Sequence, residues 1–177
     1  MAQDNSLPLS NRLESPQLEM RRRAIREVFE SRSVPSGSIV AVLRLVADRD
    51  DQVRGWACES LDRFVSASPE YVSATSEELA AVIAELRRTN DGEIQYWATT
   101  LLERIGPAAA AATAVLADVL LDSSCLAARE RAAKTLAILG PAARPALNSL
   151  RQIGSDDPPR LRRLAESAIA AMSQRAA

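Results

Sequence analysis

The 177-residue sequence contains no histidine, only one lysine and two cysteines. Without histidine it lacks the usual zinc ligand sets and the base of Ser-His-Asp and Cys-His catalytic arrangements. The cysteines, Cys58 and Cys125, form no redox or zinc motif and no secreted disulfide framework. We therefore expect no catalytic residue, no metal site and no cofactor.

The chain also lacks a strong excess of charge of either sign, and it lacks long apolar runs. The net charge of −1 argues against a nucleic-acid partner and against an anionic membrane surface. No apolar run approaches the roughly 20 residues that a transmembrane helix needs. The N-terminal segment 1–15 lacks the basic start and apolar core of a signal peptide. These observations predict a cytoplasmic protein with no membrane contact.

What the sequence does contain is a short pattern that recurs five times. Each copy centres on an alanine, and these alanines stand at positions 24, 57, 98, 132 and 165. A period of roughly 33 to 41 residues, as here, is typical of stacked helical repeats. The fold prediction is all-α, an α-solenoid of stacked antiparallel helix hairpins.

Both helices of each predicted hairpin have helical apolar spacing. Positions −4, 0, +4 and +7 from each alanine lie within about 40° of one direction on a helix, which predicts a buried stripe along these second helices. First helices are predicted between them, at 36–48, 75–89, 107–122 and 141–154. With a lone helix at 15–31 this makes about nine helices and about 4.5 repeats. The longer step between Ala57 and Ala98 predicts extra loop residues at 66–73.

We predict a single repeat domain at 15–173. Residues 1–14 are polar, have no clear period and are expected to be disordered or loosely docked. Residues 174–177 are assigned to a C-terminal tail.

Two motifs resemble HEAT repeats. Val-Arg-x-x-Ala-x-x-x-Leu at 53–61 is similar to the second helix of that family, and acidic residues precede two copies, as is frequent there: Asp50, Asp51 and Asp91. Leu-Gly-Pro-Ala-Ala-Arg-Pro-Ala-Leu at 139–147 is similar to the linker and first helix of bacterial HEAT-like repeats, which also occur in phycobilin lyases. The resemblance covers about 15–173. It implies a superhelical solenoid whose second helices line the concave side, and a protein-binding or scaffolding role.

An arginine stands three residues before the alanine in four copies: Arg21, Arg54, Arg129 and Arg162. One interpretation is a basic ladder along one groove. The alternative is that each guanidinium binds a loop acid or carbonyl at the junction between repeats, with its stem packed. Because the residue recurs so regularly, we favour the structural role.

The position just before the alanine varies much more, and it carries the candidate binding residues. It holds Arg23, Trp56, Trp97, Arg131 and Leu164 in the five copies. Stacking would place the tryptophans side by side with arginines flanking them, and Trp and Arg are enriched at binding hot spots. The alternative is that both tryptophans fill gaps in the packing. The candidate partner-binding residues are Trp56, Trp97, Tyr96, Arg23 and Arg131.

These observations favour a non-enzymatic scaffold that binds a protein or peptide on its concave face, as a monomer. Two alternatives stay open. HEAT-like DNA glycosylases act on alkylated bases with concave Trp, Arg and Asp residues along a basic channel, but the near-neutral charge argues against this class. Phycobilin-lyase-like chromophore handling is the other, and no residue selects for a bilin.

Overall fold

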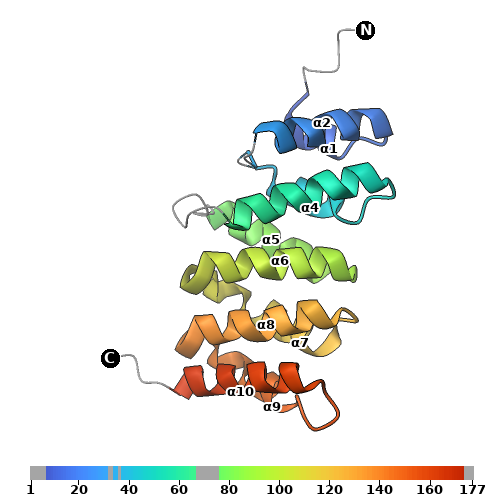
Figure 1. The fold of residues 1–177 in the computed structure, drawn as a ribbon. Coiled ribbons are helices and arrows are strands. Elements are labelled where there is room, and N and C mark those ends of the chain that lie inside the picture. The colour runs from blue at the N-terminus through green and yellow to red at the C-terminus, as the bar shows by residue number, and fades with distance from the viewer. Residues whose placement is uncertain (1–6, 32–33, 36, 67–75, 174–177) are drawn as a thin grey trace. The chain divides into compact units, whose positions relative to one another are not determined.

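The computed structural model describes residues 7–31, 34–35, 37–66 and 76–173 (Figure 1). Every regular element among these residues is an α-helix or a 3-10 helix, so the all-α prediction is confirmed. The chain divides into two compact units, Met1–Val82 and Ile83–Ala177. The single repeat domain at 15–173 stays a prediction, and the tail at 174–177 lies outside the described residues.

The first unit is built around helices α2 and α4, which pack against each other (Figure 1). Its core includes fully buried side chains from four helices, among them Leu13, Ile25, Val42 and Leu61. The helices are α1 (Leu9–Leu13), α2 (Leu18–Ser31), α3 (Ile39–Leu45) and α4 (Asp51–Ser66). Helix α5 (Ser76–Arg88) contains the division between the units.

Helix α1 lies within the segment that was expected to be disordered or loosely docked. It packs against α2 and α3, and Leu13 at its end has no exposed surface. Burial of this leucine explains why the segment adopts a helix although it has no repeat period. Residues 1–6 of that segment lie outside the described residues, as do 67–73 of the extra loop predicted at 66–73.

The second unit has two layers of helices. Helices α6, α8 and α10 lie side by side in one layer, and α7 and α9 lie behind them (Figure 1). The elements are α6 (Gly92–Ile105), η3 (Gly106–Ala112), α7 (Thr113–Asp122), α8 (Leu126–Leu139), η4 (Gly140–Ala146), α9 (Leu147–Arg151) and α10 (Pro159–Ser173).

The alanine of each copy is buried, as the predicted stripe requires, although the stripe members Phe64, Ile105 and Ile169 are only half-buried. The exposed fraction of the alanine is 2% at Ala165 and 0% at the other four positions. A methyl group at this point lets the next helix approach closely, so the alanine register sets the packing within each unit.

The predicted first helices at 107–122 and 141–154 are each divided into a 3-10 segment and an α-helix. In the first, Ala109 has the non-helical angles φ −80° and ψ 15°, which interrupt the α-helical ladder. In the second, Pro145 lies inside the 3-10 segment and has no N–H to donate. Each repeat of this unit therefore has three segments rather than a simple hairpin.

By length and composition, the helical run Gly92–Asp122 is apolar enough to cross a membrane, and half of its most apolar window is buried inside the protein. The run is not one straight helix. Gly106 has a φ of 69° and ends α6, and η3 and α7 follow with α7 in the second layer. The burial fits a core element of a packed unit.

Three of the four recurring arginines, Arg21, Arg54 and Arg129, make the contacts of the structural role that we favoured. The Nε of Arg162, in contrast, is buried without a hydrogen-bond partner among the described residues. In the first unit, Arg21 donates to both carboxylate oxygens of Asp48, at 2.7 and 3.2 Å, and Arg54 donates to the Asp48 carbonyl at 2.7 Å. In the second unit, Arg129 donates to the Leu120 carbonyl at 2.8 Å and to Asp157 at 2.7 Å. These bonds connect loops and successive repeats, which satisfies groups at the helix ends.

Candidate functional site

The five candidate residues fall into two groups. Arg23 and Trp56 belong to the first unit, and Tyr96, Trp97 and Arg131 belong to the second. The structure brings the members of the second group together, and it places Trp56 in a separate cluster of its own unit.

Trp56, on α4, is half-buried against α2. Its ring centroid is 6.3 Å from that of Phe29, and the guanidinium of Arg26 lies 5.0 Å from the ring centre. Arg23 is exposed on α2. The contacts of Trp56 are therefore aromatic and cation–π packing between two helices of the first unit.

The second group is organised around Tyr96 on α6. Trp97 is only 9% exposed and meets the tyrosine ring edge to face, with centroids 5.4 Å apart and an interplanar angle of 77°. Arg131, on α8, donates to the Tyr96 hydroxyl at 3.2 Å, and its guanidinium lies 5.4 Å from the ring centre. Trp97 thus supports Tyr96 from the core, while Arg131 holds its hydroxyl.

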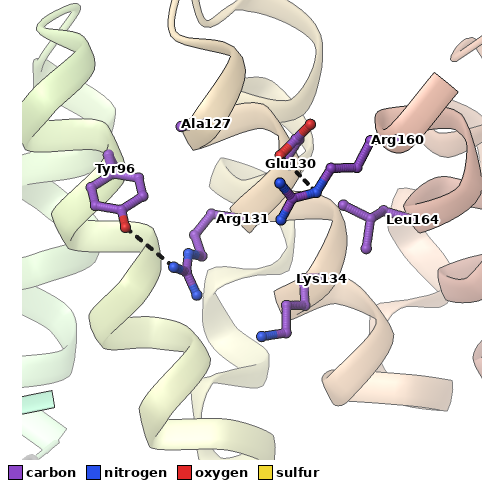
Figure 2. A pocket seen from close by; sticks show the side chains of 7 residues that line it. All are labelled: Tyr96, Ala127, Glu130, Arg131, Lys134, Arg160 and Leu164. Atoms are coloured by element: carbon purple, nitrogen blue, oxygen red, sulfur yellow. Dashed lines mark hydrogen bonds and ion pairs between the residues drawn. The ribbon is translucent and has the colours of Figure 1, made fainter. Parts of the chain in front are cut away.

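Tyr96 and Arg131 line a pocket of about 420 Å³ on the layer formed by α6, α8 and α10 (Figure 2). Helix α6 supplies Tyr96 and helix α10 supplies Arg160 and Leu164. Helix α8, between them, supplies Ala127, Glu130, Arg131 and Lys134. The pocket therefore draws on three successive helices of one layer.

Helical spacing explains why these residues share one opening. Ala127, Arg131 and Lys134 are four and three residues apart, so they project from the same side of α8. Arg160 and Leu164 have the same relation on α10. Lys134 and Arg160 were not among the candidates, although the i, i+3 and i, i+4 neighbours of Arg131 and Leu164 would have identified them.

The acids of the site lie deeper than its cations. Glu103 on α6 accepts from Arg131 at 2.8 Å and from Lys134 at 2.6 Å, and Glu130 pairs with Arg160 at 3.2 Å. The side chains of Glu103 and Glu130 are each 15% exposed, whereas those of Lys134 and Arg160 are 51% and 74% exposed. A ligand that approaches the pocket therefore meets positive charge first.

The pKa of Glu103 reflects this arrangement. Burial raises the pKa, but hydrogen bonds and charge from Lys134 and Arg131 outweigh burial and leave the pKa below its ordinary value of 4.5. For Arg131, burial lowers the pKa, while the hydrogen bonds to Glu103 and Tyr96 raise it by more. Both groups are charged at neutral pH.

Because folding lowers the pKa of Glu103, the carboxylate stabilises the protein fully above its unfolded-state pKa. That contribution is lost as the pH falls through the folded-state value. We expect the wild type to lose more stability than Glu103→Gln between pH 7 and pH 3, since the amide does not titrate. Urea midpoints of both proteins measured over this pH range test the prediction. Equal losses of stability in the wild type and in Glu103→Gln would contradict it. Asp50 and Asp157, whose pKa values are also lowered, are retained in both proteins.

In the described part of the chain, no group of three or more His, Cys, Asp or Glu side chains could hold a metal ion. The pocket lining offers three cations, a carboxylate, a phenol and aliphatic carbon. Such a set can form ion pairs, hydrogen bonds and apolar contacts.

Comparison with known proteins supports the fold class. No family model and no characterised protein matches the sequence. Solved structures do match, among them a designed armadillo repeat protein in complex with the peptide (KR)4, with a TM-score of 0.64 and 17% identity over 93% of this chain and 80% of that one. A second is a computationally designed armadillo repeat protein for modular peptide recognition, with a TM-score of 0.62 and 18% identity over 92% and 80%.

A third match is an engineered protein, with a TM-score of 0.63 and 21% identity over 93% of this chain and 77% of that one. At these identities the likeness concerns the fold alone. The chain therefore has the all-α fold of helical-repeat solenoids, which confirms the predicted fold class.

Proposed function

We propose that this protein is a non-enzymatic helical-repeat scaffold that binds a segment of another protein on the face carried by α6, α8 and α10. The observation that carries the proposal is the pocket, because residues of three neighbouring helices open into it together (Figure 2). Tyr96 supplies a ring held by Trp97 and Arg131, and such supported aromatic residues are typical of binding hot spots.

The spacing of the helices suits an extended segment. Packed helices lie about 8–10 Å apart, so three of them span roughly 20 Å. An extended chain advances about 3.3 Å per residue and covers that span with about six residues. The two designed neighbours that are named for peptide binding or recognition support this mode.

Within the helical-repeat class we propose a HEAT-like subtype, on the Val-Arg-x-x-Ala-x-x-x-Leu motif and the acids before it. The three-segment repeats of the second unit also fit an armadillo-like description, since the two families differ in having two or three helices per repeat. A concave binding face, a monomeric state and a cytoplasmic location belong to the same proposal.

No specific observation favours the two alternatives. The glycosylase type needs tryptophan rings available to a base, and Trp97 is instead buried against Tyr96. The bilin alternative has no residue in the pocket that points to it.

Panning a random peptide library on the immobilised protein tests the proposed function without assuming the charge of the partner. We expect enriched peptides whose affinity falls about tenfold or more in Tyr96→Ala, because the ring forms one wall of the pocket. Leu126→Ala is the matched control, since this side chain is 42% exposed on α8 and lines no part of the pocket. No enrichment, or equal affinity for Tyr96→Ala and the wild type, would contradict the proposal.

A further inference from the structure

The layer that carries the pocket has an excess of positive charge. Helices α6, α8 and α10 contain seven basic and four acidic residues, although the whole chain has a net charge of −1. The corresponding helices of the first unit, α2 and α4, contain six of each. The excess is therefore a property of the second unit's binding layer and not of the repeat itself.

The acids of the site are less exposed than its cations, so the surface of the pocket is positive. Glu103 and Glu130 lie beneath the cations and are 15% exposed, while the outer ends of Lys134 and Arg160 are in solvent. One carboxylate, that of Glu103, serves both Arg131 and Lys134. The cations at the mouth of the pocket are thus held in place without being fully neutralised.

These cations also retain donors for a ligand. Among the described residues, the Lys134 ammonium uses one of its three N–H donors and the Arg160 guanidinium one of its five. Lys134 comes from α8 and Arg160 from α10, and both line the same opening (Figure 2). Leu164 and Ala127 provide apolar carbon next to them.

We propose that this pocket selects an acidic peptide segment. A carboxylate of the segment pairs with Lys134 and Arg160, and a neighbouring apolar side chain packs on Leu164. In an extended segment, side chains two residues apart point to the same side, about 7 Å apart, so a Glu followed two positions later by an apolar residue presents both chemistries to the pocket. This assignment rests on the proposed function and adds the class of partner.

A peptide fits this site better than a nucleic acid does. Nucleic-acid binding depends on many Lys and Arg residues that neutralise successive phosphates. Here three cations meet in one pocket, and two carboxylates lie directly below them. That arrangement can pair with one or two carboxylates but does not offer the series of cations that successive phosphates need.

The test uses fluorescent peptides of about eight residues, long enough to cross three helices. One repeats Glu-Ser-Leu-Ser, so that Glu and Leu lie on the same side of the extended chain, and matched peptides carry Gln or Lys in place of Glu. Anisotropy titrations of the full-length protein at about 20 mM salt should give at least tenfold tighter binding for the Glu peptide. Raising the salt to about 150 mM should weaken that binding, because exposed charges are screened.

Lys134→Gln and Arg160→Gln should each weaken binding of the Glu peptide severalfold, and the double variant about tenfold or more. Both side chains are largely exposed, and Glu103 keeps Arg131 as a partner in either variant. Arg151→Gln is the matched control. Arg151 is exposed on α9 and lies outside the pocket, and its replacement removes the same charge. The affinity of this variant should equal that of the wild type.

Five results would overturn the assignment. Equal binding of the Gln peptide would show apolar recognition, and an equal loss in Arg151→Gln would show attraction by overall charge. Tighter binding of an oligonucleotide than of the Glu peptide would favour nucleic acid. If panning yields Tyr96-dependent peptides that are neutral or basic, acidic selectivity fails while peptide binding stands. If no peptide of any charge binds, both proposals fail.

Discussion

Replacing Trp97 by alanine is expected to lower the free energy of unfolding by about 3–5 kcal/mol, the usual cost of truncating a buried large aromatic residue. Only 9% of Trp97 is exposed, and its ring supports Tyr96 edge to face. The substitution removes apolar burial and leaves a cavity beneath the pocket wall. Urea unfolding followed by circular dichroism measures the loss.

Trp56→Ala provides the comparison, because this tryptophan is half-buried and should lose less stability. A wild-type urea midpoint for Trp97→Ala would show that the ring is not part of the core. The comparison also affects binding experiments. Loss of binding in Trp97→Ala would reflect damage to the fold. Tyr96→Ala therefore tests the binding face more directly.

Gly140→Ala is expected to destabilise the second unit by about 1–3 kcal/mol. Gly140 ends α8 with a φ of 55° and a ψ of −130°, a backbone conformation that is nearly restricted to glycine. The nearest atom that an added Cβ would meet is the Ala171 carbonyl oxygen at 3.8 Å, which is ordinary contact. The expected cost is therefore backbone strain and not a clash. Gly106→Ala should behave in the same way, since its φ is 69° and its ψ is −142°.

Gly55→Ala makes the same chemical change but should have the opposite effect on stability. Gly55 lies in the interior of α4, and a Cβ there meets no atom within 4 Å. This variant should stabilise the first unit by about 0.5–1 kcal/mol, because alanine loses less backbone freedom than glycine in a helix. Thermal unfolding of the two variants should shift the midpoint in opposite directions. A shift in the same direction would contradict the backbone argument.

The alanine register could be predicted from the sequence because it depends on local spacing: the same small residue recurs where neighbouring helices touch. The division of 107–122 at Ala109 could not, since no residue in that apolar period marks it, whereas Pro145 is visible in the sequence as a residue that interrupts or begins the helix in 141–154. Helix α1 was missed for a similar reason. Its leucine is buried by contacts with α2 and α3, and such contacts are not visible in a single segment.

Two residues of the pocket were among the sequence candidates. Arg131 was a candidate because equivalent positions in stacked helices become neighbours, and Tyr96 because it stands beside that row; the structure places the two in contact. Lys134 and Arg160 were missed, because comparing one position across repeats ignores the stripe that runs along each helix. The depth of Trp97 also could not be derived. Its angle lies at the border of the buried stripe, where the adjacent side chains decide how far a ring is covered.

The glycine–proline junctions at Gly106 and Gly140 have a consequence for protein engineering. They lie one repeat apart, and their glycines share the same unusual backbone conformation. The segment 106–139 is therefore a repeat unit that begins at one such glycine and ends just before the other. Inserting a second copy in tandem would join like ends to like ends and would add to the layer of α6, α8 and α10 one further helix with its own Arg and Lys pair.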